Sequence, residues 1–128
     1  MLPFTVEFRP GEPVYEQVIH VVKKAIATGQ LAPGGRFPSV RALSQELRIN
    51  PNTAHKIVAA LTADGVLTVH PGIGTAVAPP ITGTAQDRTE LLNNELERLV
   101  VEARRLGVDE DKIIAAVRKH WRKFPQSL

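Results

Sequence analysis

The spacing of apolar residues predicts helices in the first half of the chain. Apolar positions recur at helical intervals between Pro13 and about Thr28, and Gly29 follows as a residue suited to end a helix. A second helix is predicted to begin after Ser39, a good N-cap, and to run to about Arg48.

A third helix and two strands follow. Asn50 is a good N-cap and Pro51 suits the first helical position, which predicts a helix from Pro51 to about Asp64. The β-branched segment 66–70 and the segment 75–78 flank a turn at 71–74, and they predict a β-hairpin. Three helices followed by a hairpin are typical of a winged helix-turn-helix domain, with the hairpin as the wing.

The N-terminal residues 1–12 are predicted to form an extended arm. Phe4, Val6 and Phe8 alternate with polar residues, a pattern typical of a half-buried strand or strap. Pro10 and Gly11 then interrupt this pattern.

Residues 79–86 are predicted to be a linker, because two prolines and a glycine lie there among small polar residues. A helix is expected from Asp87 to Leu106 and another after the N-cap Asp109. Two helices of this size cannot bury both of their apolar faces alone, so we expect two copies of the chain to pair. The predicted dimer contacts are Leu92, Leu96, Leu99, Ala103, Leu106, Ile113, Val117 and Trp121.

The expected fold class is therefore mainly α with a small β-hairpin. Residues 1–78 are predicted to form the arm and the winged helix-turn-helix domain. Residues 87–128 are predicted to form a two-helix dimerisation or effector domain behind the linker.

Charge and composition narrow the range of possible functions. The 128-residue chain has a formal net charge of +3 and no cysteine, which excludes disulfides and cysteine-ligated metals. Between Arg36 and Lys56 lie four basic residues and one acid, so positive charge concentrates around the predicted helix-turn-helix. No apolar run approaches the roughly 18 residues that cross a bilayer, so we expect a cytoplasmic protein with no membrane partner.

Polar residues at the start of the third helix are the candidate site. A helix-turn-helix protein uses this end of its second helix to contact base edges in the major groove of DNA. Asn50, Asn52, Thr53, His55 and Lys56 lie there. The sequence therefore predicts a DNA-binding regulator.

Five segments carry a family resemblance: 13–18 (PVYEQV), 27–34 (ATGQLAPG), 37–43 (FPSVRAL), 50–53 (NPNT) and 72–75 (GIGT). In order and spacing they resemble the GntR family of bacterial transcription regulators, in particular its short YtrA-like branch. The resemblance implies a homodimer that binds a double-stranded, inverted-repeat operator and represses transcription. It implies DNA contacts from Ser39, Arg41, Asn50, Pro51, Asn52, Thr53, His55, Lys56, Gly72, Ile73, Gly74 and Thr75. The wing departs from that pattern, because it lacks an Arg or Lys near its tip.

Several assignments have a simpler alternative. Arg41 is either a solvated arginine or a DNA contact, and the sequence does not choose between a guanine and a phosphate. Asn50 is a structural cap, a DNA contact or both. The basic cluster 118–123 around Trp121 either complements the dipole of the last helix or forms a second contact with phosphate or a partner.

Other functions have weaker support. The four histidines lack metal-ligand spacing, and no serine lies in a nucleophile motif, so we expect no metal, no cofactor and no enzyme. The rival from another class is a winged-helix module that binds a protein. The sequence also leaves open whether a small-molecule effector binds. Because there is little room for a pocket after the linker, such a molecule would bind at a domain or dimer interface.

Overall fold

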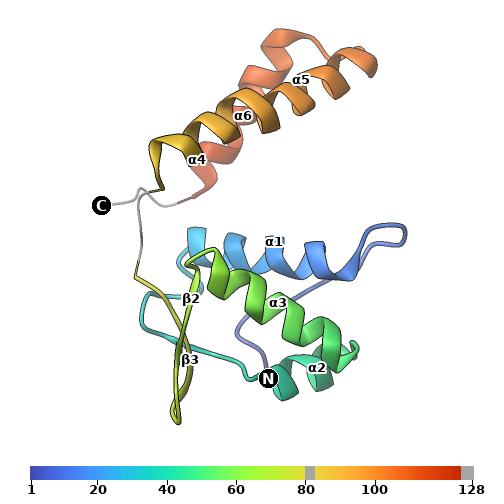
Figure 1. Cartoon of the computed structure of the whole chain (residues 1–128). Coiled ribbons are helices and arrows are strands. Elements are labelled where there is room, and N and C mark those ends of the chain that lie inside the picture. Colours follow the sequence, from blue (N-terminus) through green and yellow to red (C-terminus); the bar gives the residue numbers. More distant parts are fainter. Residues whose placement is uncertain (80–82, 125–128) are drawn as a thin grey trace. The chain divides into compact units, whose positions relative to one another are not determined.

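The computed structural model describes residues 1–79 and 83–124, which fall into two compact units. The first unit is Met1–Pro80 and the second is Ile81–Leu128 (Figure 1). Part of the predicted linker lies outside the described residues. The assignment of separate functions to residues 1–78 and 87–128 stays a prediction.

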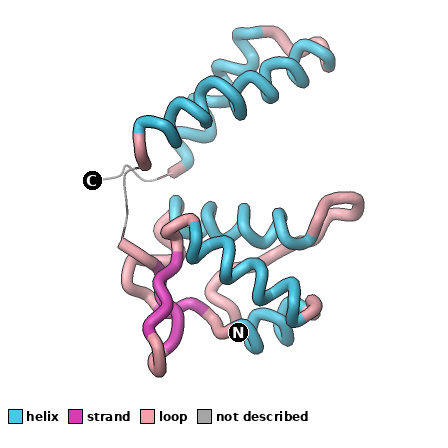
Figure 2. Tube along the Cα trace, in the orientation of Figure 1, coloured by secondary structure: helices cyan, strands magenta, loops and turns pink. Residues whose placement is uncertain are grey.

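The first unit contains three helices and a small antiparallel sheet (Figures 1 and 2). Its elements are α1 (Val14–Ala27), β1 (Arg36–Phe37), α2 (Val40–Leu47), α3 (Pro51–Ala63), β2 (Leu67–His70) and β3 (Gly74–Val77). The strand order is β1-β3-β2, and the register pairs Leu67 with Val77 and Val69 with Thr75. The predicted fold class is confirmed, but the wing hairpin belongs to a three-stranded sheet because β1 pairs with β3.

The core of this unit consists of apolar side chains from every element. Helix α3 buries one face against α1 and α2, and β2 and β3 close the core beside α3. No polar or charged residue is buried among residues 1–79 and 83–124. The largest fully buried side chains are Leu43, Ile57, Leu61, Val18, Val22 and Val77.

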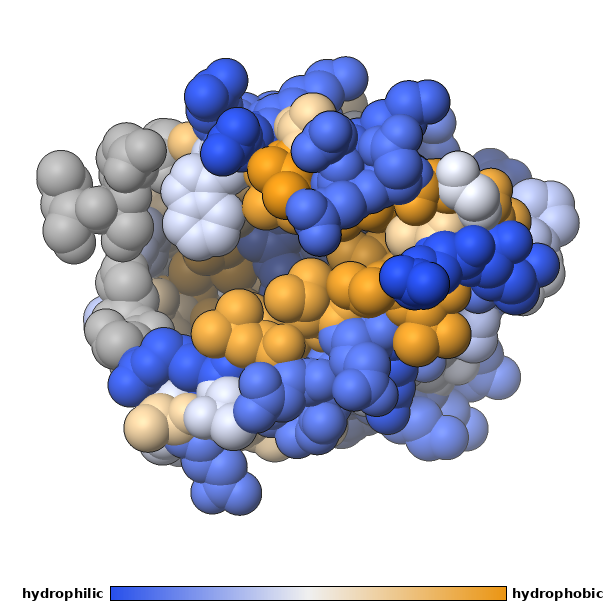
Figure 3. All heavy atoms as spheres, turned by 90° about the horizontal axis from the view of Figure 1, so that it is seen from above, coloured by the Kyte–Doolittle hydropathy of each residue, from blue (hydrophilic) through white to orange (hydrophobic). Residues whose placement is uncertain are grey.

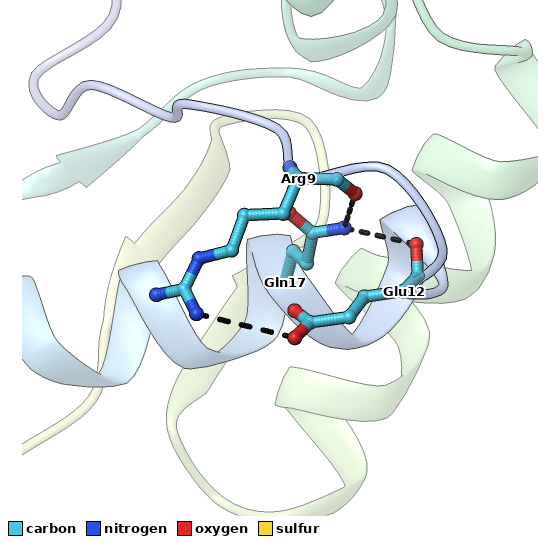
Figure 4. A network of polar contacts seen from close by, with 3 residues as sticks. All are labelled: Arg9, Glu12 and Gln17. Atoms are coloured by element: carbon cyan, nitrogen blue, oxygen red, sulfur yellow. Dashed lines mark hydrogen bonds and ion pairs between the residues drawn. The ribbon is translucent and has the colours of Figure 1, made fainter.

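Several contacts hold the N-terminal arm against the first unit, and the arm forms no strand. The Phe4 ring stacks on the ring of Phe37, with centroids 5.9 Å apart and planes inclined by 19°. Further along, the side-chain amide of Gln17 on α1 clamps the chain (Figure 4). Its oxygen accepts from the Arg9 amide at 2.8 Å, and its nitrogen donates to the carbonyls of Arg9 at 3.1 Å and Glu12 at 2.9 Å. The arm is therefore a strap across the first unit.

The second unit is a pair of helical segments. Its elements are α4 (Ala85–Glu90), the π-helical η1 (Leu91–Glu95), α5 (Leu96–Arg105) and α6 (Glu110–Lys123). The predicted helix 87–106 begins two residues early, because Thr84 and Asp87 form a reciprocal capping box. It is not regular either: the amide of Leu96 donates to the carbonyl of Leu91, which is the i to i+5 bond of a π turn. Sequence periodicity did not predict this turn.

Replacing Phe4 tests the strap. We expect Phe4→Ala to lower the free energy of unfolding by about 3 kcal/mol, because a buried, stacked ring is lost. The matched control is Phe8→Ala in the same arm, since Phe8 is 39% exposed and its loss leaves the core intact. Urea denaturation of both variants gives the comparison, and equal losses would contradict the strap.

Candidate nucleic-acid interface

The turn between α2 and α3 is fixed by its own side chains. The Ser39 hydroxyl caps α2 by accepting from the Ala42 amide at 3.1 Å. The Ser44 hydroxyl donates to the carbonyl of Ile49 at 2.8 Å, inside the turn. The Asn50 side-chain oxygen then accepts from the Asn52 amide at 2.8 Å and caps α3. The start of α3 is thus set rigidly relative to α2.

Helix α3 divides into an inner and an outer face. Ala54, Ile57, Val58 and Leu61 are buried, and this spacing turns the positions between them outward. The exposed residues of the outer face are Asn52, His55, Lys56, Ala59 and Ala63, and Pro51 is exposed at the first position of the helix. Ala59 was not among the predicted contacts, although the helical period that places Asn52, His55 and Lys56 there includes it. Thr53 is half-buried at the edge of this face.

Arg41 lies in the first turn of α2 and is exposed. No ion pair involves it among the described residues. Its guanidinium therefore has five donors available for a phosphate or a guanine.

The wing tip is an apolar turn between two glycines. Gly72 and Gly74 have φ of +78° and +131°, which a residue with a side chain rarely adopts. The Ile73 amide donates to the His70 carbonyl at 3.0 Å and closes the turn. The Ile73 side chain is 75% exposed at the tip of this turn.

A cation that sequence reasoning did not assign to the wing lies beside it. Strand β1 pairs with β3 so that Arg36 lies opposite Ala76, two residues from Gly74. Arg36 is exposed. The wing tip itself has no Arg or Lys, but this sheet pairing brings one next to it.

The first unit contains all of the predicted DNA contacts, in three groups. Ser39 and Arg41 begin α2, the residues from Asn50 to Lys56 begin α3, and Gly72–Thr75 form the wing turn. In Figure 1 the α2 end of α3 and the wing turn extend toward the lower side of this unit. The contact of these residues with DNA stays a prediction.

An open apolar groove runs along the second unit, between the segment formed by η1 and α5 and the helix α6. It has a volume of about 1050 Å³, larger than the sequence led us to expect of the helical pair. Figure 3 shows an orange apolar strip between blue hydrophilic borders. Of the predicted dimer contacts, the groove is lined by Leu92, Leu96, Leu99, Ala103, Ile113 and Val117. Leu106 and Trp121 do not line it, and Trp121 is 73% exposed.

Ion pairs one turn apart occur along α5 and the preceding π turn. The Arg98 guanidinium lies 3.0 Å from the Glu95 carboxylate. The Arg105 Nε donates to Glu102 at 3.1 Å, and this hydrogen bond lowers the pKa of the Glu102 carboxyl. The apolar groove therefore belongs to helices that are otherwise charged.

Two kinds of feature are absent from the part of the chain that the structure describes. None of the helices in residues 1–79 and 83–124 is long and apolar enough to span a bilayer. Within the same ranges no three His, Asp or Glu side chains gather as a metal site would require.

Comparison with known proteins gives consistent matches. Residues 14–77 match the model of a family described as "Bacterial regulatory proteins, gntR family". The chain is 30% identical over 106 residues to the HTH-type transcriptional repressor YtrA of Bacillus subtilis (strain 168), covering 82% of each chain. These matches confirm the predicted resemblance, including that to the YtrA-like branch.

Two solved structures extend the comparison. A transcriptional antiterminator from Listeria monocytogenes EGD-e has a TM-score of 0.82 at 22% identity, over 98% of this chain and 95% of that one, and it supports the fold alone. AraR(DBD), solved in complex with operator ORX1, has a TM-score of 0.52 at 28% identity, over 58% of this chain and 95% of that one.

Substitutions of Asn50 test the cap separately from binding. We expect Asn50→Ala to lower the free energy of unfolding by about 1 kcal/mol, because the Asn52 amide loses its acceptor. Asn50→Asp retains an acceptor and is expected to leave stability unchanged. It places a negative charge on the candidate interface, however, and should weaken DNA binding in a mobility-shift assay. Equal stability of all three proteins would show that the cap contributes nothing.

Proposed function

The chain belongs to the gntR family of bacterial regulatory proteins and is a DNA-binding transcription regulator, and we propose that it acts as a homodimeric repressor at an inverted-repeat operator. The observation that carries this proposal is the outer face of α3. Asn52, His55 and Lys56 are exposed on one side of a helix whose other side is buried and whose start is fixed by the Asn50 cap.

In the proposed complex each protomer inserts the start of α3 into a major groove. The Asn52 amide suits the donor and acceptor pair of an adenine, and Lys56 suits a phosphate. Ala59, further along the same face, suits the methyl group of a thymine. Arg41, one element earlier, contacts either a guanine or a phosphate.

The wing is proposed to lie against the adjacent minor groove. Gly72 and Gly74 let the backbone approach closely, and the exposed Ile73 packs on the sugar walls. Arg36 supplies the positive charge that the tip lacks. This pairing of an apolar tip with a neighbouring cation distinguishes the wing from one that carries its own Arg or Lys.

The apolar groove of the second unit is the proposed dimer contact. In a single chain, the leucine, isoleucine and valine side chains that line the groove are exposed to water. A second copy of the chain would cover them and remove this apolar surface from water. A symmetric pair would also supply two α3 helices for the two half-sites of an operator.

Catalysis is not part of the proposed function. The comparisons name transcription regulators rather than enzymes, and we propose a cytoplasmic protein without a cofactor. The open groove also has room for an apolar effector that would compete with, or bridge, the two copies.

Loss of Arg41 or Asn52 tests DNA binding. We expect Arg41→Ala and Asn52→Ala each to weaken binding to the operator by about 1–3 kcal/mol, because each removes donors from the interface. Mobility-shift titrations would use the DNA upstream of the chain's own gene, with circular dichroism to confirm folding. Binding that ignores sequence, or folded variants that bind like the parent, would favour the protein-interaction module instead.

A pair of substitutions on α5 tests the dimer. Leu99 lines the groove, whereas Val101 is exposed on the same helix but does not line it. We expect Leu99→Glu to weaken the dimer by about 2 kcal/mol or more, because it places a charge in an apolar contact, and Val101→Glu to leave it unchanged. Sedimentation equilibrium distinguishes the two. A monomeric parent chain, or equal effects of both substitutions, would contradict this interface.

A further inference from the structure

Arg48 has an unusual backbone conformation. It follows the last residue of α2 with φ of +54° and ψ of +48°, the left-handed region. Among residues 1–79 and 83–124 it is the one residue other than glycine with a positive φ. Glycine adopts this conformation without cost, and a residue with a Cβ does not. The chain therefore places a long cationic side chain where the backbone favours glycine.

The side chain of Arg48 has no structural task in the folded unit. It is exposed, and no hydrogen bond or ion pair of its guanidinium is found with the described residues. What the fold uses here is the backbone, because the Arg48 amide donates to the Ser44 carbonyl and ends α2. A glycine would make the same bond.

The position of Arg48 relates it to the interface. It stands seven residues after Arg41, which is about two helical turns, so both Cα atoms lie along the same side of α2. It also precedes the Asn50 cap by two residues, next to the start of α3. Arg41 and Arg48 therefore lie at the two ends of α2. This helix borders the surface that α3 is proposed to present to the major groove.

We propose that Arg48 is a phosphate contact on the DNA backbone, retained in a strained conformation for that purpose. This inference rests on the proposed DNA-binding function and adds a residue to it. The guanidinium donates two parallel hydrogen bonds to a phosphate, which holds the register of α3 without selecting a base. A contact of this kind acts on any duplex.

Arg48→Gly separates strain from binding. We expect its melting temperature to equal or exceed that of the parent, because glycine relieves the left-handed conformation. We expect its affinity for DNA to fall about tenfold, both for the upstream duplex and for a random-sequence duplex of the same length. The slope of log K against log salt should decrease in magnitude by about 0.9 for each bound protomer. Arg48→Lys keeps the charge and should retain most of the slope.

Lys23→Ala is the matched control for the loss of one positive charge. Lys23 lies 3.3 Å from Asp64, at the opposite end of α3, and its removal should leave the salt slope unchanged. A salt slope in Arg48→Gly equal to that of the parent would overturn the inference and leave the proposed function standing. A melting temperature several degrees below the parent would overturn it as well, since Arg48 would then be structural. A parent chain that binds neither duplex would overturn the proposed function and the inference together.

Discussion

The burial of one face of α3 is the contact on which the first unit depends. Ala54, Ile57 and Leu61 are completely removed from solvent against α1, α2 and the sheet. Because side chains repeat every 3.6 residues, this burial also determines which residues face outward. The core and the candidate interface are therefore two consequences of the same helical period. A substitution that rotated α3 about its axis would disturb the core and the candidate interface together.

Much of this arrangement could be predicted because it is local. Ser39, Asn50 and Pro51 signal helix starts through short-range hydrogen bonds and steric preferences, and the structure places α2 and α3 where those signals predict them. Strand β1 was missed for the opposite reason. Two residues have no periodicity, and Arg36 and Phe37 become a strand only because β3 passes beside them about forty residues later in the chain. For the same reason, the sequence analysis did not place Arg36 beside the wing.

The candidate interface, too, was predicted from the sequence only in part. The residues that begin α3 follow from motif and helical period, whereas Arg48 is inconspicuous in the sequence until its φ is known. In the second unit, the heptad spacing predicted Leu92, Leu96, Leu99 and Leu106 as dimer contacts, and the first three line the apolar groove. Leu106 does not line it, because it is the C-cap residue at which α5 ends. The heptad pattern continues to Leu106, but the groove follows the helix only where the helix is formed.

The π turn at Leu91–Glu95 lets the helix absorb a change in chain length. A π turn accommodates one more residue than the α-helical turn it replaces, so it is the structural equivalent of an insertion. Deleting one residue between Leu91 and Glu95 would restore a regular helix and leave the segments on either side facing as they do now. The same deletion within α5 would rotate one part of that helix against the other by roughly 100° about the axis. A difference of one residue at the π turn is therefore compatible with the same apolar face along the groove.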